Sequence, residues 1–176
     1  MTAIKHKNKI LSYTAKVILV LATFQSLLLF LPRYRFHLQE ILFTKRELAG
    51  VAAWCNANLP PQAKLLIHDA GYISCATKFR MIDCVGLKTP SSIPFHARIT
   101  EPSKGEERGI AVHQIALLNK PDYLIMLDKW DGFFKITAGL RQNGWKLTPL
   151  RGNETGLKRY YEVYSLSFKA QPHSPS

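Results

Sequence analysis

Cysteine is scarce in this sequence, and its spacing excludes two common uses of the residue. Only Cys55, Cys75 and Cys84 occur in 176 residues, and an odd number cannot form a complete disulfide framework. None of them belongs to a C-x-x-C pair, which is typical of redox and zinc motifs. Cys55 falls in a helical pattern and is expected to be a small buried residue. Cys75 and Cys84 could pair if the domain faces an oxidising compartment, and the sequence leaves this open.

Motifs for metals, phosphates and catalytic nucleophiles are also missing. The six histidines show no H-x-H, H-x-x-x-H or His/Cys ligand spacing, so we expect no metal site; His113 is expected to face solvent or cap an edge of the core. There is no G-x-S-x-G elbow, no P-loop and no G-x-G-x-x-G motif. The one glycine cluster, RGNETG at 151–156, has the composition of a hairpin turn. The sequence therefore predicts no cofactor and no catalytic residue in this chain.

Acidic residues are absent from the first 16 positions, where four lysines occur. In the rest of the chain, 20 Lys and Arg outnumber 12 Asp and Glu by eight. This positive charge is scattered singly or in pairs, whereas a nucleic-acid-binding protein usually gathers it on one face. We therefore expect no nucleic-acid partner. A diffuse positive charge also suits a protein that lies near an anionic membrane surface.

Charge is missing altogether from a long apolar run, Val17 to Leu31. A helix over residues 10–31 would rise roughly 33 Å, close to the thickness of the hydrocarbon core of a bilayer. A cleaved signal peptide would need a small-residue cleavage site after the run, and none follows. A buried core helix would need a polar face, and LLLFL at 27–31 has none. The sequence predicts a transmembrane anchor over 10–32 that ends at Pro32, with a basic cytoplasmic N-terminus over 1–9 and a linker over 33–43.

The remainder of the chain alternates helical and strand patterns. At 176 residues, 47% of them apolar, it has room for one domain plus an appendage. Thr44 and Glu47 have the spacing of a capping box at the start of a helix, which Pro60-Pro61 would end. Strands are expected at KLLIHD, RMID and DYLIMLD, and further helices over 106–120 and over 131–144, where Asp131 would be the N-cap.

The C-terminal part predicts an antiparallel hairpin, with strands at WKLTPL and YEVYSLSF, followed by a flexible tail over 169–176. Together these elements predict an α/β domain over 44–168. It would have three layers, with a mostly parallel sheet between helices and the hairpin at one edge. The segment 88–105 is expected to be an irregular loop.

Polar side chains follow the predicted parallel strands at the points where they end. In open α/β sheets, ligands bind beyond the carboxyl ends of the strands. The sequence therefore predicts a ligand-binding crevice formed by His68, Asp69, Gly71, Asp83 and Asp128. Two alternatives stay open: Asp69 and Asp128 could simply cap the following helices, or the three acids could serve a small stand-alone hydrolase.

The order of motifs between Glu47 and Pro90 resembles a known family. A helix with Trp54 is followed by Pro60-Pro61, a strand leading to HDAG at 68–71, and a second strand leading to DCVGL at 83–87. This order resembles the C-terminal extracytoplasmic domain of GT-C-type bacterial membrane glycosyltransferases, similar to protein mannosyltransferases and aminoarabinose transferases, which use polyprenyl-phosphate sugars. KPDYLIML at 120–127 resembles a later strand of that family, so the likeness covers roughly residues 46–127.

The resemblance implies a tail domain of such a transferase. Family members carry many membrane helices and a catalytic acid in an early extracytoplasmic loop, whereas this chain has one candidate span. It would thus be the end of a truncated gene product or part of a split system, non-catalytic alone. Charge alone leaves the orientation tied, because basic residues flank the span on both sides, but the resemblance implies a single-pass inner-membrane protein with its domain in the periplasm. The expected role is recognition of an acceptor or partner: membrane lipid, a glycan or polyprenyl-linked sugar, or a membrane partner subunit.

Overall fold

The computed structural model describes residues 2–151 and 160–168, and the chain divides into two compact units, residues 1–44 and 45–176. The second unit begins one residue after the predicted start of the α/β domain. The predicted tail over 169–176 lies outside the described residues, as does most of the predicted turn over 151–156.

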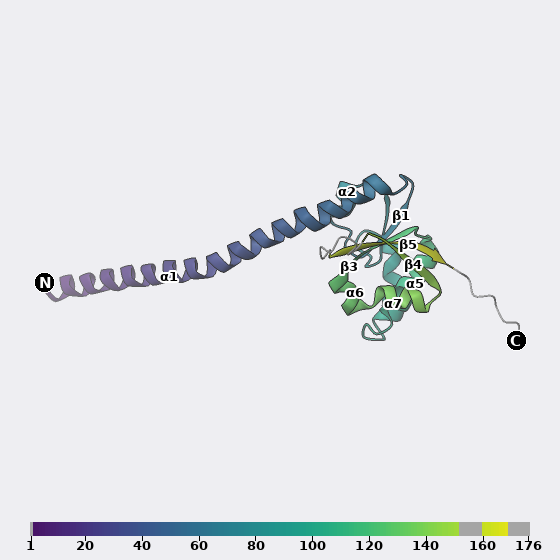
Figure 1. Ribbon diagram of the computed structural model, residues 1–176. Helices are drawn as coiled ribbons and strands as arrows, with labels where there is room; N and C mark the ends of the chain where they lie inside the picture. The colour runs from purple at the N-terminus through teal and green to yellow at the C-terminus, as the bar shows by residue number, and fades with distance from the viewer. Residues whose placement is uncertain (1, 152–159, 169–176) are drawn as a thin grey trace, which may run out of the picture. The chain divides into compact units, whose positions relative to one another are not determined.

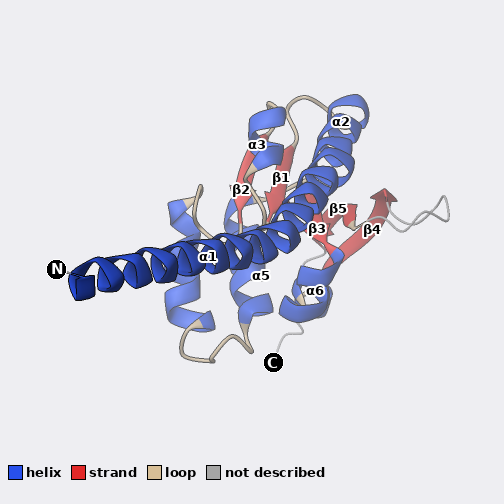
Figure 2. Cartoon of the chain, turned by 90° about the vertical axis from the view of Figure 1, so that its left-hand side faces the viewer, coloured by secondary structure: helices blue, strands red, loops and turns tan. Residues whose placement is uncertain are grey.

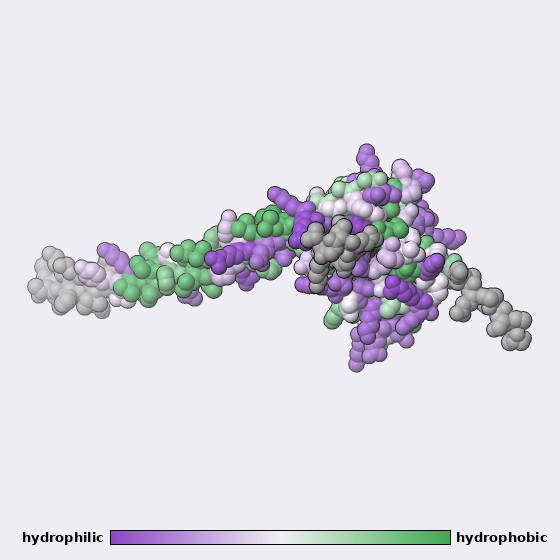
Figure 3. All heavy atoms as spheres, in the orientation of Figure 1, coloured by the Kyte–Doolittle hydropathy of each residue, from purple (hydrophilic) through white to green (hydrophobic). Residues whose placement is uncertain are grey.

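The first unit consists of the helix α1, Thr2–Phe43, which Figure 1 shows as an unbroken ribbon. Within the described residues, one helical stretch that begins at Tyr13 is long and apolar enough to cross a membrane, by length and composition. Figure 3 shows the hydrophobic side chains of α1 gathered along part of its length. Thr23 and Ser26 donate hydrogen bonds to the carbonyl oxygens of Leu19 and Ala22, so both hydroxyls are satisfied within the helix.

Residues 33–43, expected to form a linker, are helical instead, and Pro32 lies inside α1. A proline removes one backbone hydrogen bond but does not always end a helix, and the residues after it contain no glycine. The capping box at Thr44 is also absent, because a helix cannot begin where the preceding residues are already helical. Thr44 opens a π-helical turn, η1 (Thr44–Leu48), which runs directly into α2 (Ala49–Asn58).

The second unit contains one five-stranded sheet in the order β2-β1-β3-β5-β4. The strands are β1 (Lys64–Ile67), β2 (Arg80–Asp83), β3 (Tyr123–Leu127), β4 (Trp145–Arg151) and β5 (Tyr161–Phe168). β1 pairs in parallel with β2 and β3, as Figure 2 shows, while β5 runs antiparallel to both β3 and β4. The predicted hairpin at one edge is confirmed, and the sheet as a whole is mixed.

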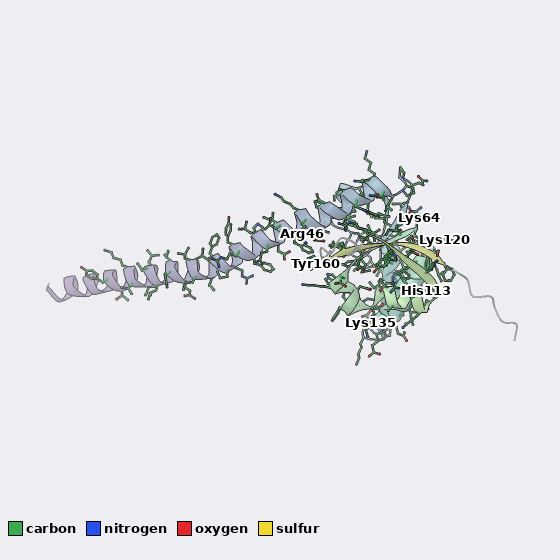
Figure 4. All side chains as sticks on the ribbon, viewed as in Figure 1. Arg46, Lys64, His113, Lys120, Lys135 and Tyr160 are labelled. Atoms are coloured by element: carbon green, nitrogen blue, oxygen red, sulfur yellow. The ribbon has the colours of Figure 1, made fainter. Side chains whose placement is uncertain are left out.

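The remaining helices of this unit are short apart from α5. They are α3 (Tyr72–Ala76), η2 (Pro90–Ser92), α4 (Ile93–Phe95), η3 (His96–Thr100), α5 (Arg108–Asn119), α6 (Asp128–Phe134) and α7 (Ile136–Gln142). Three of them lie in the segment 88–105, which we expected to be irregular. The single helix expected over 131–144 is instead two, because Lys135 adopts a left-handed conformation with φ 53° (Figure 4).

Buried side chains lie on both faces of the sheet. Successive residues of a strand point to opposite faces. Leu66 and Leu124 belong to a cluster with residues of α5 and α7, namely Val112, Ile115, Ala116, Ile136 and Leu140. The alternate residues Leu65, Ile67 and Ile125 are fully buried as well. The carboxyl ends of β1 and β3 are therefore packed against other residues on both faces of the sheet.

Candidate functional site

A cavity of about 670 Å³ opens where the parallel strands end. Its wall includes His68 and Asp69 after β1, Cys84 and Val85 after β2, and Trp130 in the helix that follows β3. This is the edge of an open α/β sheet at which ligands usually bind, and the volume suits a small organic molecule. The rest of the wall comes from the segment after Cys84 and from α5 to α7: Leu87, His96, Thr100, Arg108, Val112, Phe134 and Ile136.

His68 is the most unusual polar residue of the wall. Both of its ring nitrogens are shielded from solvent, and neither has a hydrogen-bond partner among the described residues. The ring lies between two aromatic side chains, 5.8 Å from the centroid of Trp130 and 6.4 Å from that of Tyr161. Buried polar atoms without partners are rare in folded proteins, and each one needs an explanation. His68 is therefore positioned to bind a ligand group in the cavity.

The protonation of His68 follows from its surroundings. Burial lowers the pKa of the ring, and the nearby negative charge of Asp69 only partly offsets this effect. The carbonyl of Ile125 also favours the protonated ring, although it does not reach hydrogen-bond geometry. At neutral pH the ring is then uncharged and offers one donor and one acceptor.

Asp69 is held rigidly beside His68. Its Oδ2 accepts a hydrogen bond of 2.7 Å from the hydroxyl of Tyr161, and its Oδ1 accepts a longer one of 3.4 Å from the backbone N–H of Gly71. Burial and the bond to Asp69 raise the pKa of Tyr161, which therefore stays protonated and donating. Tyr161 lies on β5, so the antiparallel hairpin helps to position a side chain of the cavity wall.

His96 is already engaged by the protein. Its Nε2 lies 2.5 Å from the carbonyl oxygen of Cys84, and its Nδ1 lies 2.9 Å from Oγ1 of Thr100. Burial raises the pKa of the Cys84 thiol to about 12, so a thiolate is disfavoured there. In the cavity wall, Thr100 and His96 thus form a hydroxyl–imidazole pair, and both ring nitrogens of His96 are engaged within the protein.

The other predicted site residues do not line this cavity. Asp83 ends β2 and is 1% exposed; its two oxygens accept hydrogen bonds of 2.8 Å from the backbone N–H groups of Val85 and Lys88. Gly71 precedes α3; its N–H donates to the carboxylate of Asp69, and its carbonyl oxygen accepts from the hydroxyl of Ser74. Asp128 is exposed, and its side chain forms no cap on α6. The geometry therefore gathers His68 and Asp69 but does not gather the three acids that the hydrolase hypothesis needs.

Sequence reasoning missed most of the cavity wall. Arg108, Trp130 and Phe134 lie on helices, and only the packing of α5 and α6 beside the strand ends brings them to the cavity. The sequence offered one signal: Trp130 closely follows Asp128 in the chain. Residues just after the end of a strand lie at the edge of the sheet where that strand ends. His113 (Figure 4), which we expected to face solvent or cap an edge of the core, is buried, and its Nδ1 accepts a hydrogen bond of 3.0 Å from Nε1 of Trp145.

A second cavity, of about 800 Å³, lies on the other side of Arg108 and Phe134. Its wall consists of the turn before α5 and the junction of α6 with α7, and it includes charged side chains such as Lys104, Glu106 and Lys135. It contains no buried polar atom without a partner among the described residues. The cavity with His68 is therefore the better candidate for a binding site.

Comparison with known proteins gives one match. Residues 35–166 match the model of a family described as Domain of unknown function (DUF8728). No curated protein and no solved structure matches the chain.

Proposed function

The chain belongs to the DUF8728 family, and we propose that it is a membrane-anchored domain that binds a glycan outside the cytoplasm and is not catalytic alone. The observation that carries this proposal is the buried, unpartnered ring of His68 in a cavity whose wall also presents Trp130. Trp130 is 45% exposed; its indole is stacked on Phe134, with the ring centroids 4.8 Å apart, and the exposed part can contact a ligand. A sugar offers hydroxyl groups for His68 and an apolar ring face for an indole.

Location in a membrane is part of the same proposal. The long apolar helix supports an anchor over residues 10–32, and an inner-membrane protein with its domain in the periplasm follows from the resemblance to glycosyltransferase tails. In that setting the ligand would be a glycan or a polyprenyl-linked sugar held near the bilayer, with lipid and a membrane partner subunit as neighbours. A three-layer arrangement of the domain is supported by the buried side chains on both faces of its sheet.

Binding is tested with the full chain in detergent or lipid nanodiscs. We expect NMR titration with neutral monosaccharides to perturb the Trp130 indole resonance in the wild type. Trp130→Leu should weaken binding at least tenfold, which corresponds to about 1.4 kcal/mol. Phe133→Leu is the matched control, because Phe133 is a neighbouring aromatic residue, 77% exposed, that does not line this cavity. Equal losses in both variants, or binding unchanged by Trp130→Leu, would contradict the proposal.

Catalysis is tested separately. The purified chain should not transfer sugar from a polyprenyl-phosphate donor to any acceptor. Turnover by the chain without another subunit would show that it is an enzyme in its own right.

A further inference from the structure

Arg108 brings an uncompensated positive charge to the same cavity. It is the first residue of α5, and its guanidinium carbon lies 3.9 Å from the ring centroid of Phe134, so the two groups are in contact. Among the described residues, no side chain forms an ion pair or a hydrogen bond with this guanidinium. The contact with Phe134 fixes the position of the charge but leaves the N–H donors available.

The acidic residues around Arg108 do not neutralise it. Asp69, the one carboxylate of the cavity wall, is occupied by Tyr161 and Gly71. Glu106 and Glu107 precede Arg108 in the chain, yet neither carboxylate comes within ion-pair distance of it. A half-buried arginine beside apolar residues such as Val112 and Ile136 loses hydration, and an anionic partner would compensate for this loss.

We propose that the sugar bound in the His68 cavity carries an anionic group, a carboxylate or a phosphate, that pairs with Arg108. This inference rests on the proposed glycan-binding function and adds the chemical class of the ligand. The sugar ring would lie against Trp130 and hydrogen-bond to His68, and its acidic group would lie against Arg108. The planar guanidinium can donate two parallel hydrogen bonds to either kind of oxyanion.

The test compares neutral sugars with anionic sugars that have the same ring and an acidic group at carbon 6. Glucose and galactose are titrated into the full chain beside glucuronate and galacturonate, which replace the hydroxymethyl group by a carboxylate, and beside the two 6-phosphates. The expected result is at least tenfold tighter binding of one anionic series than of the neutral sugars. High salt should remove most of this preference, because it screens the charge pair. The tighter series, uronates or phosphates, identifies the anionic group.

Two arginine variants separate a specific charge pair from general attraction to a basic protein. Arg108→Gln should abolish the preference, so that the anionic sugars bind this variant no more tightly than the neutral sugars do. Arg98→Gln is the matched control: Arg98 also lies over a phenylalanine, 5.5 Å from the ring centroid of Phe95, but does not line the cavity. The preference should survive in this control.

The outcomes distinguish the two proposals. Equal binding of neutral and anionic sugars would overturn the inference about charge and leave the glycan-binding function standing. A preference that persists in Arg108→Gln, or that disappears equally in Arg98→Gln, would also overturn it. If no sugar of any series binds, the glycan-binding function fails, and the inference fails with it.

Discussion

At the scale of single residues, Asp83 and Asp128 illustrate how similar positions in the sequence acquire different roles. Both follow a run of strand residues, but only Asp83 is buried, and both of its oxygens hold backbone N–H groups. We predict that Asp83→Asn destabilises the protein by about 1–3 kcal/mol, because an amide can accept only one of these two bonds well. Asp128→Asn should change stability little, since its side chain is exposed. Denaturant unfolding of the two variants checks this, and equal stabilities would contradict the structural role of Asp83.

His113 gives a pH prediction at the same scale. Burial lowers its pKa, so the unfolded chain takes up a proton at a higher pH than the folded chain does. The contribution of the neutral His113 ring to the free energy of unfolding is fully present above the ordinary histidine pKa of about 6.5. It is lost as the pH falls toward the lowered pKa of the folded chain. Protonation would also remove the acceptor for the Trp145 N–H. His68, whose pKa is also lowered, contributes with the same sign.

We therefore predict that the melting temperature falls between pH 7.5 and pH 5.5, and that it falls less in His113→Gln. The amide oxygen of glutamine can still accept from Trp145 but does not titrate. Differential scanning calorimetry across this range measures the effect. An identical pH dependence in the wild type and the variant would show that His113 does not contribute.

At the scale of elements, the crossing of α5 and α7 depends on two glycines. A Cβ added at Gly139 would lie 2.5 Å from the Cα of Gly109, and one added at Gly109 would lie 2.8 Å from the Cα of Gly139. Backbone atoms cannot move aside as flexible side chains do, so the helices would have to separate. We predict that Gly139→Ala destabilises the domain by roughly 1–3 kcal/mol, as overpacking typically does.

The matched control for this prediction is Gly132→Ala in α6. A Cβ at Gly132 would meet no atom within 4 Å, and alanine favours a helix over glycine by up to about 1 kcal/mol. This variant should be as stable as the wild type or slightly more so in chemical denaturation. A stabilising Gly139→Ala would show that the close helix crossing is not required.

Among the helices and strands, some could be predicted from the sequence and others could not. The buried parallel strands β1 and β3 are short apolar runs followed by polar residues, and β5 alternates, so these patterns predict the observed strands. The break at Lys135 was not predictable, because lysine carries no signal for a left-handed conformation. Asp131 was expected to be an N-cap. It lies within α6 instead, and its carboxylate accepts hydrogen bonds from the backbone N–H and the hydroxyl of Thr137.

Some residues of the candidate site could be predicted from the local sequence, and others could not. His68 and Asp69 directly follow a strand, and local sequence is enough to place them at the edge of the sheet. Arg108 and Phe134 are at least 39 residues away from them in the chain, so their presence in the cavity depends on helix packing that no local pattern encodes. The exposed position of Asp128 likewise depends on how α6 leaves β3.

At the scale of the whole molecule, three native cysteines provide a test of sidedness. Cys75 is exposed, while Cys55 and Cys84 are buried, and all three are free. Burial raises the pKa of Cys55 to about 11 and that of Cys84 to about 12, so neither reacts readily as a thiolate. A maleimide that cannot cross membranes should therefore modify Cys75 alone in the folded chain.

If the domain lies outside the cytoplasm, this reagent should label the chain in intact, right-side-out vesicles without detergent. Cys75→Ser should remove the signal, and denaturation of the same variant should restore labelling through the two buried cysteines. Labelling that requires permeabilised vesicles would place the domain in the cytoplasm and overturn the proposed orientation. Chain recovered in the soluble fraction would contradict the anchor itself, because a helix of this length and apolarity should be extracted from the bilayer only by detergent.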